Sequence, residues 1–222
     1  MASYRSYEQY SQGGQDVYVT NILREKRDGY FVEVGAYDGF TISNTYLLEK
    51  NYGWKGICIE ATPYRIQDLK NNRPNAICIE TAVFSESNLE LDFTTTPIDI
   101  LNVITEYAEI AVDFLNQNGQ IIKVSTKTLT DILIENNAPE NIDYLSIDTN
   151  GSEFKVLEGL DFTKYKFNVI TVKNSSVVER QDIIKEILTS SGYSKEQTVT
   201  MVDNISDDLY VPNSTYNEGT IF

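Results

Sequence analysis

Short apolar runs alternate with amphipathic segments along most of this chain. The apolar runs are nearly continuous, are rich in Val, Ile, Phe and Tyr, and cover residues 30–34, 56–60, 76–80, 142–148 and 167–172. Runs of this kind are typical of strands that are buried on both faces of a parallel sheet. The amphipathic segments cover residues 43–51, 63–71, 128–137, 152–158 and 177–190, and several open with Ser, Thr or Pro, as helices do. The alternation predicts an α/β fold, a doubly wound sheet with helices on both faces.

The end of the chain departs from this alternation. Residues 196–203 and 208–211 have the pattern of strands, and a polar turn without a helix joins them. Two successive strands predict an antiparallel hairpin at the edge of a mostly parallel sheet. A seven-stranded sheet closed in this way is the Rossmann-like fold of class I methyltransferases, and we predict that topology here.

The length of 222 residues fits a single domain over residues 1–222. Within it, residues 1–28 are expected to form an N-terminal helical segment. Residues 89–127 fit the alternation least and predict an insertion over the strand ends, where long insertions often form lids or substrate walls. The tetrapeptide ICIE occurs at residues 57–60 and again at 77–80. We interpret it as two neighbouring buried parallel strands and not as a duplicated unit.

The composition narrows the possible chemistry. The chain has 18 basic residues, 33 acidic residues, a net charge of −15 and no histidine. Without histidine, Ser-His-Asp and Cys-His nucleophile systems and His-rich zinc sites are excluded. Acid/base work must therefore use carboxylate, tyrosine, lysine or water. The sequence pI near 4.4 also argues against a nucleic-acid partner, because neutralising phosphates requires clustered Lys and Arg.

No stretch of the sequence has the length and apolar character of a membrane span, and the N-terminus has no apolar signal core. We therefore expect a cytoplasmic protein. Cys58 and Cys78 are too few for a disulfide framework, and we expect buried free thiols.

In open α/β sheets, ligands bind beyond the carboxyl ends of the strands. The first predicted strand leads into FVEVGAYDGFTISNT at residues 31–45, in which Gly35 would permit a turn and a close backbone approach. A phosphate-binding G-x-G-x-x-G motif is absent, since Tyr37 stands where its second glycine would be. Glu33 also disfavours a pyrophosphate and suits a cationic ligand, such as the sulfonium and ammonium groups of S-adenosylmethionine (SAM). The alternative for Glu33 is a buried ion pair.

Acids also follow the second and fourth strands. Glu60 is placed to accept hydrogen bonds from both ribose hydroxyls of an adenosine-type cofactor, or alternatively to cap the helix that starts near Pro63. Asp148 is the first candidate for a general base or metal ligand, although an Asp before a Gly turn is also an ordinary turn residue. Glu153 is expected to face solvent or to cap that turn.

Taken together, these segments resemble the FkbM-type methyltransferases. The matching segments are SQGGQD (11–16), FVEVGAYDGFTISNTYLLE (31–49), GWKGICIEATP (53–63), LSIDTNGSEFKVLEG (145–159) and GY (192–193). The resemblance implies a SAM-dependent O-methyltransferase, often acting on hydroxyls of sugars or other natural-product scaffolds. It implies cofactor contacts from Gln15, Glu33, Gly35, Ala36, Asp38, Ser43, Asn44, Glu60, Ala61, Ala82 and Asp148, with Asp16 near the same cleft.

The chain departs from this family's pattern at two neighbouring strand ends. Members commonly read D-x-E-G after the fourth strand, where this chain has Asn150 in place of the second acid. They commonly carry Glu-His-Asn after the fifth strand, where this chain has Lys173, Asn174 and Ser175. The local charge changes by about three units, which disfavours Mg²⁺ or Mn²⁺ if those acids were its ligands.

Three interpretations remain open at this point. In the first, a metal-independent O-methyltransferase uses Asp148 as its base, or Lys173 with a pKa lowered by burial. In the second, Asp148 and Asn150 still hold a divalent cation. In the third, the chain is a SAM-binding or scaffold module that has lost the chemistry. The expected acceptor is a small molecule or a glycan. The sequence leaves open the oligomeric state and whether the chain is one domain of a longer protein.

Overall fold

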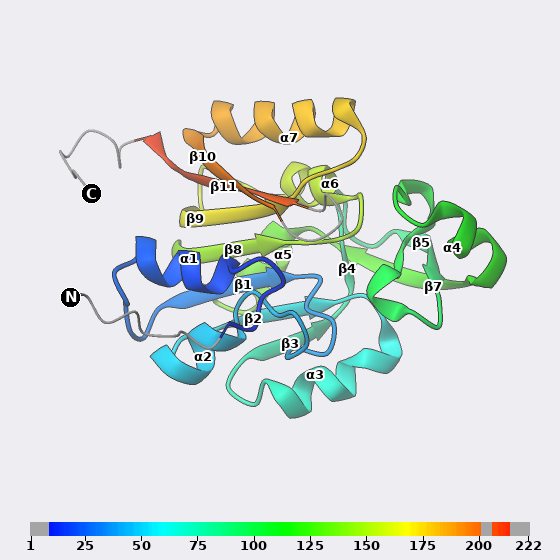
Figure 1. Ribbon diagram of the computed structural model, residues 1–222, viewed down its shortest axis with the longest axis horizontal. Coiled ribbons are helices and arrows are strands. Elements are labelled where there is room, and N and C mark those ends of the chain that lie inside the picture. The colour runs from blue at the N-terminus through cyan, green and yellow to red at the C-terminus, as the bar shows by residue number, and fades with distance from the viewer. Residues whose placement is uncertain (1–8, 201–205, 214–222) are drawn as a thin grey trace.

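A seven-stranded sheet forms the centre of the molecule in the computed structural model, which describes residues 9–200 and 206–213 (Figure 1). The strand order is β10-β11-β9-β8-β1-β2-β3. The strands are β1 (Tyr30–Val34), β2 (Lys55–Glu60), β3 (Ile77–Glu80), β8 (Asn141–Ile147), β9 (Lys166–Lys173), β10 (Tyr193–Thr200) and β11 (Ser206–Pro212). Only the β11 pairings with β9 and β10 are antiparallel in this sheet. The predicted Rossmann-like topology with a C-terminal hairpin is therefore confirmed.

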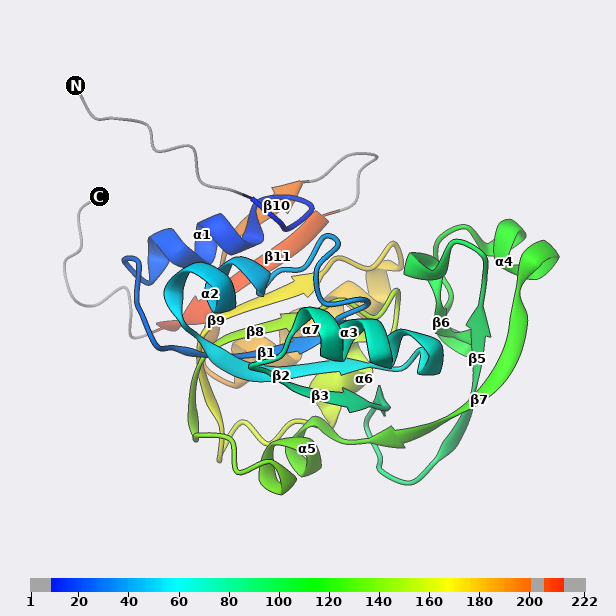
Figure 2. The ribbon, with the colours of Figure 1, turned by 90° about the horizontal axis from the view of Figure 1, so that it is seen from below.

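Helices cover both faces of the sheet, because alternate strand residues point to opposite faces and both sets are apolar. One face packs against α1 (Gln15–Ile22), α2 (Tyr46–Tyr52) and α3 (Ile66–Asn72). The other packs against α5 (Leu129–Glu135), α6 (Glu153–Glu158) and α7 (Val178–Ser190). Figure 2 looks onto the first of these faces, with α1, α2 and α3 in front of the sheet.

The sequence predicted the central strands and their flanking helices to within a few residues. The ICIE segments lie on adjacent parallel strands, as interpreted, and Cys58 pairs in register with Cys78. Both thiols are free, but only Cys58 is buried. β3 is the edge strand and half exposed, so its predicted burial on both faces is wrong. Of the predicted strand at 196–203, residues 201–203 lie outside the described residues.

A second, smaller sheet lies beyond the carboxyl ends of the parallel strands (Figure 1). Its order is β4-β7-β5-β6, and its strands are β4 (Ala82–Val83), β5 (Glu90–Thr95), β6 (Val103–Ile104) and β7 (Gln120–Lys127). It also carries helix α4 (Val112–Asn118) and short 3₁₀ helices at Asp99–Leu101 and Thr105–Tyr107, while a further 3₁₀ helix at Pro63–Arg65 precedes α3. The segment expected as an insertion thus builds most of a sheet that the sequence pattern did not reveal.

In the described part of the chain, no helix is long and apolar enough to cross a membrane. The longest, α7, has 13 residues.

Candidate active site

One row of the sheet brings the predicted residues together at the strand ends. The pairings align a row of apolar residues across four strands, namely Ile59, Val34, Ile147 and Val172. The next residue along each strand is glycine or charged: Glu60, Gly35, Asp148 and Lys173. Because side chains alternate between faces with a period of two, these residues share one face, that of α1, α2 and α3. An apolar row therefore supports a polar row at the carboxyl edge of the sheet.

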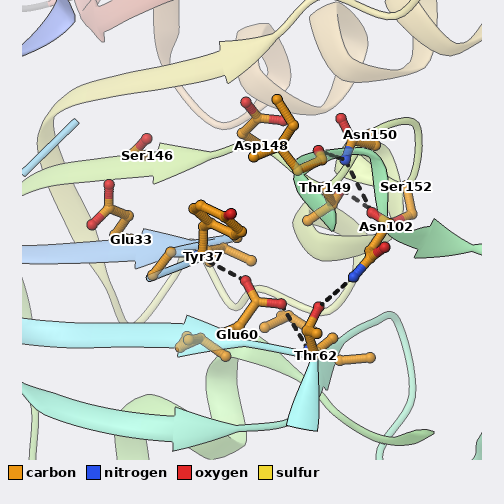
Figure 3. Close-up of a pocket in the computed structure, with 18 of the residues that line it drawn as sticks. Glu33, Tyr37, Glu60, Thr62, Asn102, Ser146, Asp148, Thr149, Asn150 and Ser152 are labelled. Atoms are coloured by element: carbon orange, nitrogen blue, oxygen red, sulfur yellow. Dashed lines mark hydrogen bonds between the residues drawn. The ribbon is translucent and has the colours of Figure 1, made fainter. Parts of the chain in front are cut away.

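A cleft that is open to solvent lies at this polar row and encloses, with the solvent space at its mouth, about 880 Å³ (Figure 3). The predicted residues that line it are Glu33, Gly35, Ala36, Ser43, Asn44, Glu60, Ala61, Ala82, Asp148 and Asn150. The second sheet contributes further lining residues that the sequence did not point to, namely Phe93, Asp99, Ile100, Asn102 and Ile104. Residues from both sheets and their connecting segments thus form the walls of the cleft.

Glu60 lies at the centre of one wall of the cleft. Its Oε2 accepts the Tyr37 N–H at 2.8 Å and its Oε1 accepts the Thr62 N–H at 2.7 Å, as Figure 3 shows. Burial raises the pKa of Glu60, while these backbone donors lower it. The carboxylate therefore holds the turns after β1 and β2 together and at the same time lines the cleft.

Gly35 has a structural reason to be glycine. Its φ is +84°, and a Cβ at this position would lie 1.8 Å from the backbone oxygen of Asp148. Any side chain here would collide with main chain that cannot move away cheaply. The close backbone approach expected at Gly35 is therefore found between β1 and the end of β8, where it brings Asp148 against the turn.

Glu33 forms a buried ion pair, which was the alternative for this residue. Its Oε2 accepts from Arg73 at 3.1 Å and from the Thr45 hydroxyl at 2.7 Å, and its Oε1 accepts the Asn44 N–H at 2.8 Å. The Ser43 hydroxyl donates to both oxygens. Arg73, which no sequence pattern singled out, has no exposed surface. Glu33 borders the cleft, but its hydrogen bonds fix the turn that carries Ser43 and Asn44 along the wall.

Two other expected cofactor ligands lie outside the lining of the cleft among the described residues. Asp38 accepts hydrogen bonds from the N–H groups of Phe40 and Thr41 and so closes its own turn. Gln15 is buried, and its Nε2 donates to Asp207 at 2.8 Å. Asp16, expected near the cleft, is also fully buried, and its carboxylate accepts hydrogen bonds within the segment before α1.

Lys173 lies behind Asp148 and is bound on two sides. Its Nζ donates to Asp148 Oδ1 at 2.8 Å and to Asn150 Oδ1 at 2.9 Å. Burial lowers the pKa of Lys173, but the charges of Asp148, Glu153 and Asp207 outweigh it, and the net shift is upward. The expectation of a lysine base with a lowered pKa is therefore wrong, and Lys173 stays an ammonium ion.

The same contacts bear on a metal at this position. The Lys173 ammonium lies between the two oxygens that the cation alternative assigned to a divalent metal. Within residues 9–200 and 206–213, no group of three or more His, Cys, Asp or Glu side chains has a metal-binding arrangement. The positive charge at this strand end is thus supplied by the chain itself.

Asn150 binds the second sheet's segment to the main sheet. Its Nδ2 donates to the backbone oxygens of Ile100 and Asn102, each at 3.0 Å. Asn102 in turn donates to the hydroxyl of Thr62 (Figure 3). Asn174, at the other departure from the family pattern, points elsewhere and donates to Asp208. The two substituted strand ends therefore have different partners.

Two further groups at the site were not predicted as functional. The Tyr37 hydroxyl donates to Asp99 at 2.8 Å, and Arg65 pairs with the same carboxylate, so these contacts bind the second sheet's segment to the turn after β1.

Glu153 does not face solvent, since it is 1% exposed and accepts the N–H groups of Thr149 and Gly151. Burial and the charge of Asp148 raise the pKa of Glu153 to about 7. Its expected role as a cap for the turn is confirmed.

Comparisons with known proteins agree with this geometry. A family model described as the methyltransferase FkbM domain matches residues 33–195. No curated protein matches the sequence.

Solved structures are similar in fold. The O-methyltransferase from Bacillus cereus in complex with SAH (S-adenosylhomocysteine) has 13% identity over 95% of this chain and 84% of that chain, with a TM-score of 0.51. The METTL16 methyltransferase domain has 10% identity over 89% and 65%, with a TM-score of 0.54. The N-terminal domain of human METTL16 has 12% identity over 89% and 67%, with a TM-score of 0.50. At such identities the likeness shows a shared fold.

Proposed function

Because the chain belongs to the FkbM methyltransferase family, whose members use SAM, we propose that it methylates a hydroxyl oxygen of a sugar in a glycan or natural product. The observation that carries this proposal is Asp148, a carboxylate at the end of β8 that lines the cleft and is oriented by an ammonium ion. A hydroxyl acceptor has to lose a proton on methylation, and a carboxylate placed in this way can take it.

The donor set of the cleft fits SAM. Glu60 would bind the ribose hydroxyls from the end of β2, the position at which adenosine-type cofactors meet an acid in this class of fold. Ala82, Val83, Phe93 and Ile104 would form an apolar wall for the adenine. Ser43 and Asn44 also line the cleft, where Asn44 donates to Ser146 two residues before Asp148, and they would meet the methionine part. When bound, SAM would supply a methyl group attached to a positively charged sulfur; on transfer, the sulfur keeps the electron pair of the broken S–CH3 bond and becomes a neutral thioether.

The chain's own residues orient the acceptor and take its proton. Asp148 uses Oδ1 to accept from Lys173, its side chain is 29% exposed and it lines the cleft, so Oδ2 is the oxygen that would meet the acceptor. The hydroxyl proton passes to that oxygen while the acceptor oxygen gains the methyl group. Since transfer from a sulfonium needs mainly in-line positioning, a weak base such as a carboxylate suffices. Thr149, Ser152 and Asp99 line the same cleft with groups that hydrogen-bond sugar hydroxyls.

The direct test offers the protein and SAM to a panel of free and linked sugars, with products identified by mass spectrometry and by NMR of the new methyl group. An O-methylated sugar is the expected product. Methylation at nitrogen or carbon would contradict the proposal. Tight binding of SAM without transfer to any hydroxylated acceptor would favour the non-catalytic module instead.

Chelation of divalent metals is expected to leave turnover unchanged. The Lys173 ammonium already bridges Asp148 and Asn150, so no cation is needed to hold the two oxygens. Initial rates measured with and without EDTA check this, with a Mg²⁺-dependent O-methyltransferase treated in parallel. Loss of turnover that added Mg²⁺ restores would support the cation interpretation.

Replacing Glu60 by Ala is expected to weaken SAH binding by about 5- to 150-fold, the effect of losing roughly 1–3 kcal/mol of hydrogen bonding to a buried charged acceptor. Calorimetry with SAH measures it. The matched control is Glu80→Ala, because Glu80 is the register partner of Glu60 on the edge strand and is exposed. Equal affinities in the two variants would refute the placement of the ribose at Glu60.

A further inference from the structure

Lys173 is flanked by carboxylates on both sides within the sheet. β9 lies between β8 and β11, so the end of β8 carries Asp148 on one side of Lys173, and β11 carries Asp207 on the other. Asp207 is the direct register partner of Lys173 in the antiparallel pair. Directly opposite residues project from the same face, so the three side chains form a row of negative, positive and negative charge.

Asp207 is buried with one oxygen unsatisfied. It is 2% exposed, and its Oδ2 accepts from Gln15 at 2.8 Å. Its Oδ1 has no hydrogen-bond partner among the residues that the structure describes. A buried carboxylate oxygen without a donor is costly, and the nearby ammonium ion or a bound proton is what offsets that cost. A buried carboxylate with one oxygen that lacks a hydrogen-bond donor is unusual for a residue with a purely structural role.

The charges that face Asp207 come from several elements. They are Asp148 at the end of β8, Glu153 on α6 and Lys173 on β9, with the Tyr144 hydroxyl on β8 also near. Burial and the charge of Asp148 raise the pKa of Asp207 to about 7, whereas Gln15 and Lys173 lower it. One ammonium ion therefore lies near three carboxyl groups and forms an ion pair with Asp148 alone, while Asp207 is able to gain or lose a proton near neutral pH.

We propose that Asp207 is a positioning residue for methyl transfer: its charge acts on the Lys173 ammonium that binds Asp148 and so sets how strongly Asp148 binds the acceptor proton. This inference rests on the proposed function. When Asp207 is protonated, Lys173 pairs with Asp148 alone, and Asp148 is a weaker base. When Asp207 is ionised, it competes for the ammonium and adds negative charge, and Asp148 becomes a stronger base. Transfer is therefore expected to quicken as the pH rises through neutrality.

The test compares Asp207→Asn with Asp208→Asn. The first keeps the shape of the side chain and an oxygen for Gln15, but it cannot ionise. The second removes the same charge one residue along, from a carboxylate that bonds to Asn174 and Thr198 on the other face of the sheet. The pH profile of kcat is expected to rise near pH 7 in the wild type and in Asp208→Asn. In Asp207→Asn this rise should be lost, and kcat above neutral pH should fall by roughly tenfold.

A second measurement follows the titration of Asp207 directly and needs neither turnover nor a known acceptor. Carbon-13 NMR of the aspartate carboxyl groups in the SAH complex is expected to show one group that titrates near pH 7 and vanishes in Asp207→Asn. If that variant does not fold, Gln15→Leu serves instead. Because Gln15 lowers the pKa of Asp207, its removal should move both the NMR titration and the rise in kcat to higher pH.

The possible failures are distinct. An active wild type whose pH profile and carboxyl titration are the same in Asp207→Asn overturns the role of Asp207 and leaves the O-methyltransferase intact. A wild type that binds SAH but methylates no hydroxyl at any pH overturns the proposed function, and the inference falls with it.

Discussion

Replacement of Asp148 by Asn is expected to lower kcat for methyl transfer by about 10²- to 10⁴-fold, the usual range for loss of a general base. The amide keeps the shape of the side chain and an oxygen for Lys173 but cannot accept a proton. Lys173 retains the charges of Glu153 and Asp207 around it, so the fold should survive. Initial rates at saturating SAM and acceptor measure the effect, and calorimetry with SAH should show an affinity within a few fold of the wild type.

The control for this variant is Asp161→Asn. Asp161 accepts hydrogen bonds within an exposed turn away from the cleft, and its replacement should leave kcat unchanged. If Asp148→Asn retains most of the wild-type rate, Asp148 is not the base and methyl transfer here depends on positioning alone. If SAH affinity collapses together with the rate, Asp148 acts mainly as a cofactor ligand.

Replacement of Arg73 by Met is expected to cost about 3–5 kcal/mol of unfolding free energy, the range found when one member of a buried ion pair is removed. Arg73 has no exposed surface and pairs with Glu33 at 3.1 Å and with Glu49 at 2.6 Å. Met fills much of the volume but leaves both carboxylates without their cation. Denaturant unfolding followed by circular dichroism measures the change, and the control is Lys70→Met on the exposed side of α3, the helix that Arg73 follows.

A double variant separates the charge effect from simple loss of packing. Glu33→Gln combined with Arg73→Met removes one of the two carboxylates that would otherwise lack a cation. The double variant should therefore lose less unfolding free energy than the sum of the losses in the two single variants. Additive losses would mean that Arg73 stabilises the protein through its contacts and not through its charge. The turn that carries Ser43 and Asn44 depends on this ion pair, so SAH affinity should fall in parallel with stability.

The sequence predicted the main sheet well because its strands are buried on both faces, which leaves nearly continuous apolar runs. It misjudged β3 because ICIE has the same pattern there, and only the strand order reveals that β3 is an edge. The second sheet was missed for a different reason. β4 and β6 have two residues each, too few to show any period, and most residues in the first half of β5 are exposed.

The residues that line the cleft were predictable where their place depends only on the end of one recognisable strand. Gly35, Glu60 and Asp148 each stand at the carboxyl end of a recognisable strand, and the structure gathers them at one cleft. Residues whose state depends on distant partners were not predictable. The Lys173 pKa depends on carboxylates from three other elements, and Arg73 meets Glu33 only after folding. Such partners leave no local pattern in a single sequence.

The amide of Asn150 makes the second sheet and Lys173 depend on one side chain. An amide donates to the backbone oxygens of Ile100 and Asn102 while accepting from Lys173, whereas the acid that relatives commonly carry here has no N–H to donate. Restoring that acid alone would set a carboxylate against two carbonyl oxygens and loosen the second sheet. Restoring the acid that relatives commonly carry in place of Lys173, with Asn150 kept, would leave Asp148 without a cation. Because Asn150 and Lys173 contact each other and Lys173 binds Asp148, the effects of replacing the two residues on the stability of this strand end are expected to be non-additive.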